Sequence, residues 1–195
     1  MIPEYFAYFS IFFCIIGSYY YIKDTIHGKT RPNRVTWIFW SLAPLVAVYV
    51  GYKSGISLPL LASTFTAGFS PLLIVVASFF NKNSYWRITK FDILCGALSF
   101  IAIIIWVVTK NGIISLIFAI LADLFAGIPT IIKSWKHSET ETAGPYTLGI
   151  LSQTITLLVI PNLSFQNYAF PLYIILANTI IVSGIKKNLF IRGKI

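Results

Sequence analysis

The chain has 195 residues, of which 57% are hydrophobic and 11% are charged, and its mean hydropathy is +0.79. A soluble domain has about 45–50% apolar and about 25% charged residues, so this composition indicates an integral membrane protein. Seven helical spans of about 20 residues would use about 140 residues and leave about 55 for every loop and tail. That remainder leaves no room for a separate catalytic, nucleotide-binding or DNA-binding domain.

The predicted elements are seven apolar runs. In chain order they are 5–22, 35–51, 59–80, 91–109, 113–133, 146–160 and 169–185. None shows the sustained alternation over about ten residues that is typical of membrane β-strands, and only helices or closed barrels satisfy the backbone in lipid. The sequence therefore predicts an all-α integral membrane protein with seven transmembrane helices.

The basic residues predict an orientation. Thirteen of the 15 lie after the first, third and fifth runs or in the carboxyl-terminal tail, namely Lys23, Lys29, Arg31, Arg34, Lys82, Arg87, Lys90, Lys133, Lys136, Lys186, Lys187, Arg192 and Lys194. Only Lys53 and Lys110 lie on the opposite side. The positive-inside rule then places the amino terminus outside and the carboxyl terminus in the cytoplasm, and we expect a bacterial cytoplasmic (inner) membrane. The net charge of +9 is explained by topology and lipid headgroups, with no recognition fold for nucleic acid.

Residues 110 positions apart indicate an internal repeat. The matched pairs are Gly17 and Gly127, Lys23 and Lys133, His27 and His137, and Thr30 and Thr140. This offset spans three helices and one more. Because the extra helix carries the chain back across the membrane, two three-helix units would face the same way, which is a known transporter plan. We expect a first repeat with its cytoplasmic connection in 1–90, a linker helix in 91–112, and a second repeat with a cytoplasmic tail in 113–195.

The segment 129–136, Pro-Thr-Ile-Ile-Lys-Ser-Trp-Lys, resembles the PQ-loop signature, in which Pro-Gln near a helix end precedes apolar and basic residues. Thr130 stands in place of the glutamine. With its helix plan and outside amino terminus, the whole chain resembles the PQ-loop and SWEET-type transporters, and vitamin transporters of the PnuC type share that plan. The resemblance implies a solute pathway between two three-helix bundles, Pro44 and Pro129 as hinges, and a sugar, amino acid or vitamin as the solute.

Asp123 is the one acidic residue placed deep inside an apolar run. A carboxylate there costs about 2.5–3.5 kcal/mol on insertion scales. On a helical projection it shares an arc with Ala119, Ala126 and Gly127, whereas Leu124 lies opposite, so we predict that it points into the bundle. Two interpretations stay open. Asp123 is either a protonatable coupling or substrate-binding group, or a structural carboxyl that is hydrogen-bonded to a neighbouring helix.

Further site candidates lie on predicted inner faces. Asn178 resembles, by element and depth, the asparagine on the seventh helix that contacts substrate in SWEET-type transporters, and Thr66 is its counterpart if the repeat register slips by two. Gln153 lies on a polar face of the sixth helix. Each amide either contacts a hydroxylated solute or joins two helices. Trp37 and Trp40 form either a stacking wall for a solute ring or part of the interfacial aromatic belt.

We predict no cofactor, metal or catalytic site. Cys14 and Cys95 lie in apolar runs without metal-ligand spacing, and His27 and His137 have no acid or cysteine at such spacing. No glycine-rich phosphate loop or nucleophile–base pair appears, which argues against an enzyme.

Two functional hypotheses follow. The first is a small secondary transporter or facilitator of a polar organic solute, working by alternating access with Asp123 as a proton site; its expected partners are the solute, the lipid bilayer and a proton. The second is a non-transporting membrane receptor or adaptor that binds a ligand or partner with the same bundle.

Overall fold

The structure is a computed structural model that describes residues 6–53, 58–109, 111–160 and 164–192. Over these residues it contains seven α-helices, two short 3-10 helices and no strand, which confirms the all-α prediction for the described part of the chain. The α-helices are α1 Ala7–Ile26, α2 Arg34–Lys53, α3 Leu58–Ala77, α4 Lys90–Val108, α5 Gly112–Lys136, α6 Gly144–Val159 and α7 Phe165–Arg192. The 3-10 helices η2 and η3 cover Lys82–Ser84 and Ser138–Thr140.

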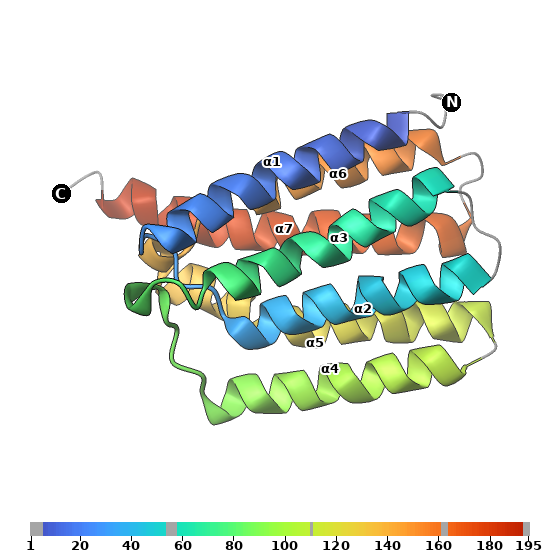
Figure 1. The fold of residues 1–195 in the computed structure, drawn as a ribbon, viewed down its shortest axis with the longest axis horizontal. Helices are drawn as coiled ribbons and strands as arrows, with labels where there is room; N and C mark the ends of the chain where they lie inside the picture. Colours follow the sequence, from blue (N-terminus) through green and yellow to red (C-terminus); the bar gives the residue numbers. More distant parts are fainter. Residues whose placement is uncertain (1–5, 54–57, 110, 161–163, 193–195) are drawn as a thin grey trace.

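The helices run side by side as an elongated bundle (Figure 1). In the described part of the chain, three helical segments are long and apolar enough to cross a membrane, namely Lys90–Val108, Gly112–Lys136 and Phe165–Lys187. Arg34–Val50 and Leu61–Ala77 are shorter apolar stretches of the same kind. These helices indicate a membrane protein.

Local sequence explains several helix ends. Asn111 caps α5 by accepting hydrogen bonds from two backbone N–H groups, and Thr89 with Asp92 forms a reciprocal capping box at the start of α4. At its carboxyl end α7 continues to Arg192, beyond the predicted end of the apolar run at 185. Lysine and arginine are good helix formers, so helix propensity carries α7 past the apolar run.

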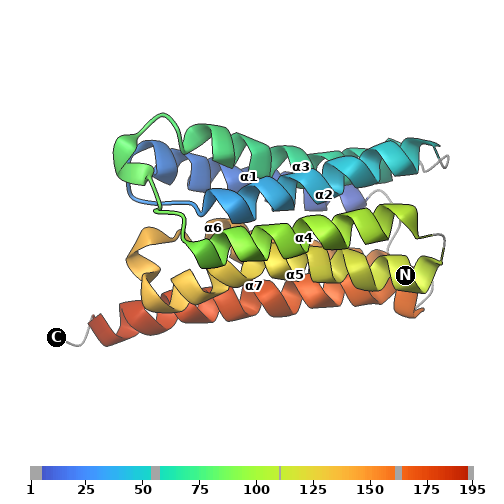
Figure 2. The same ribbon diagram turned by 90° about the horizontal axis from the view of Figure 1, so that it is seen from below.

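The two halves of the bundle have the same order of neighbours. In the first half α3 packs between α1 and α2, and in the second half α7 packs between α5 and α6. Between the halves α1 packs on α6, and α2 packs on α5. Helix α4 packs on α5 and α2 outside this arrangement, as the lowest helix in Figure 1 and in front of them in Figure 2.

Two glycines allow the halves to approach. A Cβ atom added to Gly17 on α1 would lie 2.8 Å from Cα of Pro145 on α6. A Cβ atom added to Gly127 on α5 would lie 3.2 Å from Cζ2 of Trp40 on α2. The two glycines separated by 110 residues therefore occupy corresponding crossings between the halves.

One end of the bundle, which we call the basic end, is formed by the connections 27–33, 78–89 and 137–143, and α7 also ends there (Figure 1, left). The start of α1 lies at the opposite end. At the basic end, the backbone N–H of Arg31 donates a hydrogen bond of 2.9 Å to the carbonyl of Thr140. This bond joins the α1–α2 connection to the α5–α6 connection and so ties the two halves together.

Candidate functional site

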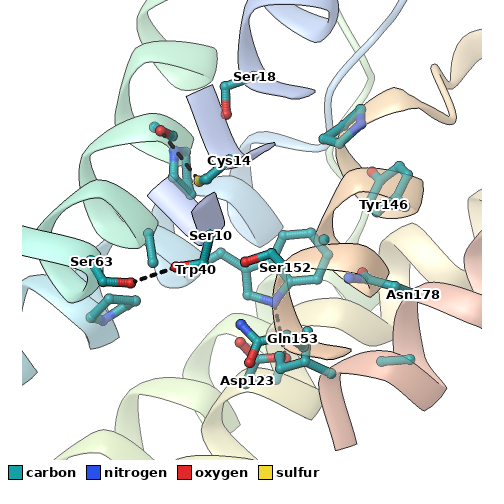
Figure 3. Close-up of a pocket in the computed structure, with 18 of the residues that line it drawn as sticks. Ser10, Cys14, Ser18, Trp40, Ser63, Asp123, Tyr146, Ser152, Gln153 and Asn178 are labelled. Carbon is teal, nitrogen blue, oxygen red and sulfur yellow. Dashed lines mark hydrogen bonds between the residues drawn. The ribbon is translucent and has the colours of Figure 1, made fainter. Parts of the chain in front are cut away.

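A cavity of about 210 Å³ lies between the two halves of the bundle. Its lining residues come from α1, α2, α3, α5, α6 and α7, so that α4 is the one α-helix in the described chain that does not contribute (Figure 3). The cavity brings together Asp123, Gln153, Asn178, Trp37 and Trp40 from the predicted site. Thr66 is not among the residues that line it; its hydroxyl instead donates to the carbonyl of Ala62 at 2.8 Å.

Asp123 is the single acidic residue among those that line the cavity. The Tyr173 hydroxyl on α7 donates to Oδ2 of Asp123 at 2.8 Å. The indole N–H of Trp40 on α2 donates to the backbone carbonyl of Asp123 at 3.2 Å. The carboxylate is therefore held by α7, while its backbone is joined to the opposite half of the bundle. Tyr173 was missed by the sequence analysis because nothing in its local sequence shows that α5 and α7 are neighbours.

Two amides line the same cavity, Gln153 from α6 and Asn178 from α7 (Figure 3). Gly149 on α6 makes room for one of them, because an added Cβ atom there would lie 2.6 Å from Nδ2 of Asn178. An amide offers both a donor and an acceptor. This side of the cavity can therefore hydrogen-bond hydroxyl, carbonyl or amine groups of a solute.

Three aromatic side chains form a wall of the cavity, namely Trp37, Trp40 and Tyr146. The ring centroids of Trp37 and Trp40 are 5.2 Å apart, and that of Tyr146 is 6.2 Å from Trp37 and 6.4 Å from Trp40. Trp37 is only 4% exposed, so its ring is a core group between the halves and does not face lipid headgroups. Its indole N–H interacts with the hydroxyl of Tyr21, although the contact does not have the geometry of a regular hydrogen bond.

The first half of the bundle contributes small hydroxyl and thiol groups to the cavity lining. Ser10 and Ser63 lie 3.2 Å apart between their Oγ atoms, and the Cys14 thiol lies 3.7 Å from Oγ of Ser70. Ser10, Cys14 and Ser18 all line the cavity at the i, i+4 and i+8 positions of α1, which is the spacing of one helix face. That spacing is the signal by which the sequence could have identified this wall.

The two proposed hinge prolines both lie inside helices, Pro44 in α2 and Pro129 in α5. Pro44 lines the cavity, whereas Pro129 is buried about 1.7 turns from Asp123 along α5. Pro71 in α3 is a further cavity-lining proline inside a helix. Pro171 likewise lies inside α7. Each proline removes one intrahelical hydrogen bond, so four helices around the cavity carry a point of lower bending stiffness.

A buried ion pair lies between the cavity and the basic end. Nζ of Lys133 is 2.7 Å from Oε1 of Glu141, and the two side chains are 1% and 0% exposed. The hydroxyls of Tyr21 and Tyr146 donate to Oε2 of Glu141 at 2.9 and 3.0 Å. Lys133 also donates to the backbone carbonyl of Arg31 in the α1–α2 connection. Because Tyr146 lines the cavity as well, this network adjoins the cavity on the side of the basic end.

Comparison of the chain with protein-family models, curated proteins and solved structures finds no match. Within the described residues, no group of three or more His, Cys, Asp or Glu side chains is placed to hold a metal ion. The function therefore has to be inferred from the chemistry of the cavity itself.

Proposed function

We propose that the protein is a small secondary transporter or facilitator that moves a polar organic solute across the membrane. The observation that carries this proposal is the convergence of Asp123, Gln153 and Asn178 on one cavity that also receives Ser10 and Ser63 from the other half of the bundle. Polar groups at membrane depth are costly and mark solute or ion pathways. Had these side chains lain in separate, dry helix contacts, a joint role in solute binding would be hard to defend.

The proposed topology has seven transmembrane spans, with the amino terminus outside and the basic end in the cytoplasm of a bacterium. Helices α1, α2 and α3 have 20 residues each, which corresponds to about 30 Å, the thickness of the hydrocarbon core. The connections that carry the basic residues gather at one end of the bundle, as the positive-inside rule requires.

The proposed mechanism is alternating access by two parallel three-helix repeats, α1–α3 and α5–α7. Their matching order of neighbours and the corresponding crossings at Gly17 and Gly127 support this division. It also agrees with the proposed relation to the PQ-loop and SWEET-type transporters. The halves would rock about the cavity while α2 and α5 bend near Pro44 and Pro129. Opening toward the cytoplasm would separate Tyr21 from Glu141 and Lys133 from the Arg31 carbonyl, because these contacts join the two halves.

Solute binding and solute flux can be tested one after the other. Purified protein is screened by thermal stabilisation against sugars, amino acids and water-soluble vitamins, and each stabilising compound is then used in radiolabelled uptake into liposomes. Uptake above that of protein-free liposomes supports transport. Saturable binding without flux would favour the receptor or adaptor hypothesis, and transport is contradicted if neither binding nor flux is found.

Proton coupling and bending have separate tests. In a pH-jump uptake assay, Asp123→Asn should abolish proton-driven accumulation while sparing solute exchange; unchanged accumulation removes Asp123 from the coupling role. Replacement of Pro44 and Pro129 by alanine should slow turnover, and full turnover in the double variant contradicts the hinge role.

A further inference from the structure

The described residues that line the cavity carry a negative charge but no positive charge. Asp123 is its single acidic residue, and no lysine, arginine or histidine is present among the described residues that line it. Lys133, the buried lysine beyond Tyr146, is paired with Glu141 at 2.7 Å. An anionic solute would therefore meet uncompensated repulsion at Asp123, whereas a cationic solute would supply the charge partner that a buried carboxylate requires.

The aromatic wall lies next to this carboxylate. Trp40 donates its indole N–H to the backbone carbonyl of Asp123, and Trp37 and Tyr146 continue the wall away from it. Tryptophan attracts cations over its ring face more strongly than tyrosine or phenylalanine does. A positive charge that pairs with Asp123 would therefore lie beside the indole of Trp40.

The size of the cavity and its hydrogen-bonding groups limit which solutes can bind. A cavity of about 150 Å³ is enough to bind benzene, so the 210 Å³ here accommodates one ring with a short arm. Gln153 and Asn178 also line the cavity, and each amide offers donors as well as an acceptor. A hydroxyl or carbonyl group on the solute would accept a hydrogen bond from one of them.

We propose that the cavity selects a small organic monocation with one ring and a hydrogen-bond acceptor, whose charge pairs with Asp123 beside Trp40. This inference rests on the proposed function, because it assigns the solute class of the same cavity. One carboxylate pairs with either an organic cation or a proton. The two would therefore bind in alternation, and uptake of one would be linked to release of the other.

The test uses three probes of similar size and different charge: tyramine, a cation; tyrosol, which is neutral; and para-hydroxyphenylacetate, an anion. Binding to the purified full chain in lipid nanodiscs is measured by titration calorimetry, with empty nanodiscs correcting for partition into lipid. We expect tyramine to bind at least roughly tenfold more tightly than tyrosol, and the anion to bind most weakly. The proposal is overturned if tyrosol or the anion binds as tightly as tyramine, or if tyramine gives no heat beyond empty nanodiscs.

Two matched variants locate the effect. Asp123→Asn keeps a hydrogen-bond acceptor for Tyr173 and should reduce the tyramine-to-tyrosol preference to about onefold. Glu139→Gln removes the same charge from an exposed position at the basic end, where Glu139 lies 3.9 Å from His137, and should keep the preference. A preference retained in Asp123→Asn overturns the proposal. If that variant does not fold, Trp40→Leu decides, because it should weaken tyramine roughly fivefold and tyrosol less.

The outcomes separate this inference from transport itself. Cation-selective binding without flux of any probe would leave the solute class standing and contradict the transport function. Flux of neutral solutes, with no preference for cations, would support the transport function and contradict the proposed solute class.

Discussion

Lys133 and Glu141 form an ion pair of 2.7 Å whose side chains are 1% and 0% exposed. Glu141 also accepts hydrogen bonds from Tyr21 and Tyr146, so both of its oxygens are used. Removing one member of a buried pair leaves the other charge unpaired, which costs about 3–5 kcal/mol. We therefore expect Glu141→Gln to lower the free energy of unfolding by about that amount, measured by denaturant titration in detergent micelles.

The matched double variant separates charge from packing. Lys133→Met with Glu141→Leu removes both charges and keeps most of the side-chain volume, so it should be clearly more stable than Glu141→Gln alone. If the single variant unfolds at the same denaturant concentration as the parent, the pair does not hold the basic end together.

The same pair should control access to the cavity from the basic end. Cys14 lines the cavity, whereas Cys95 is buried, so Cys14 in a Cys95→Ala background reports access. In inside-out vesicles, a charged membrane-impermeant thiol reagent should label Cys14 slowly in this background and faster after Glu141→Gln. A Cys14→Ser variant should give no cavity labelling. Equal rates with and without the ion pair would show that other contacts close this end.

The sequence alone predicts the helices well because hydrophobicity is a local property of each run. It does not distinguish Glu139 from Glu141, which stand two residues apart in one polar connection. Only tertiary structure does so. Glu139 is exposed near His137, whereas the connection folds back and buries Glu141 against Lys133 and Tyr21.

The polar side of the cavity could be predicted in part. Helical periodicity places Asp123 and Gln153 on inner faces, and the resemblance to SWEET-type transporters points to Asn178. The convergence of the three side chains depends on how α5, α6 and α7 pack together. Thr66 is selected as the repeat counterpart of Asn178, but its hydroxyl bonds within its own helix. The 100° spacing of an α-helix assigns a face to a residue, but it does not determine whether that face meets a cavity or a neighbouring helix.

Gly17 should tolerate no side chain, because an added Cβ atom would lie 2.8 Å from the backbone Cα of Pro145. We expect Gly17→Ala to force α1 from α6 and to lower the free energy of unfolding by about 1–3 kcal/mol. Gly144→Ala is the matched control. Its Cβ atom would meet Tyr20 and Thr142 at the ordinary distances of 3.7 and 3.8 Å, so its stability should equal or exceed that of the parent. Equal stability of the two variants would contradict close α1–α6 packing.

Tyr173 should support Asp123 without itself determining charge selection. Its hydroxyl donates to Oδ2 of Asp123 at 2.8 Å, and a hydrogen bond to a charged group contributes about 1.5–3 kcal/mol. Tyr173→Phe should therefore lower the free energy of unfolding within that range in denaturant titrations, and a double-mutant cycle with Asp123→Asn should give a nonzero coupling energy. Because the carboxylate remains in the cavity, the preference for tyramine over tyrosol should persist in Tyr173→Phe and disappear in Asp123→Asn. Loss of the preference in both variants would mean that the orientation of the carboxylate, set by Tyr173, matters as much as its charge.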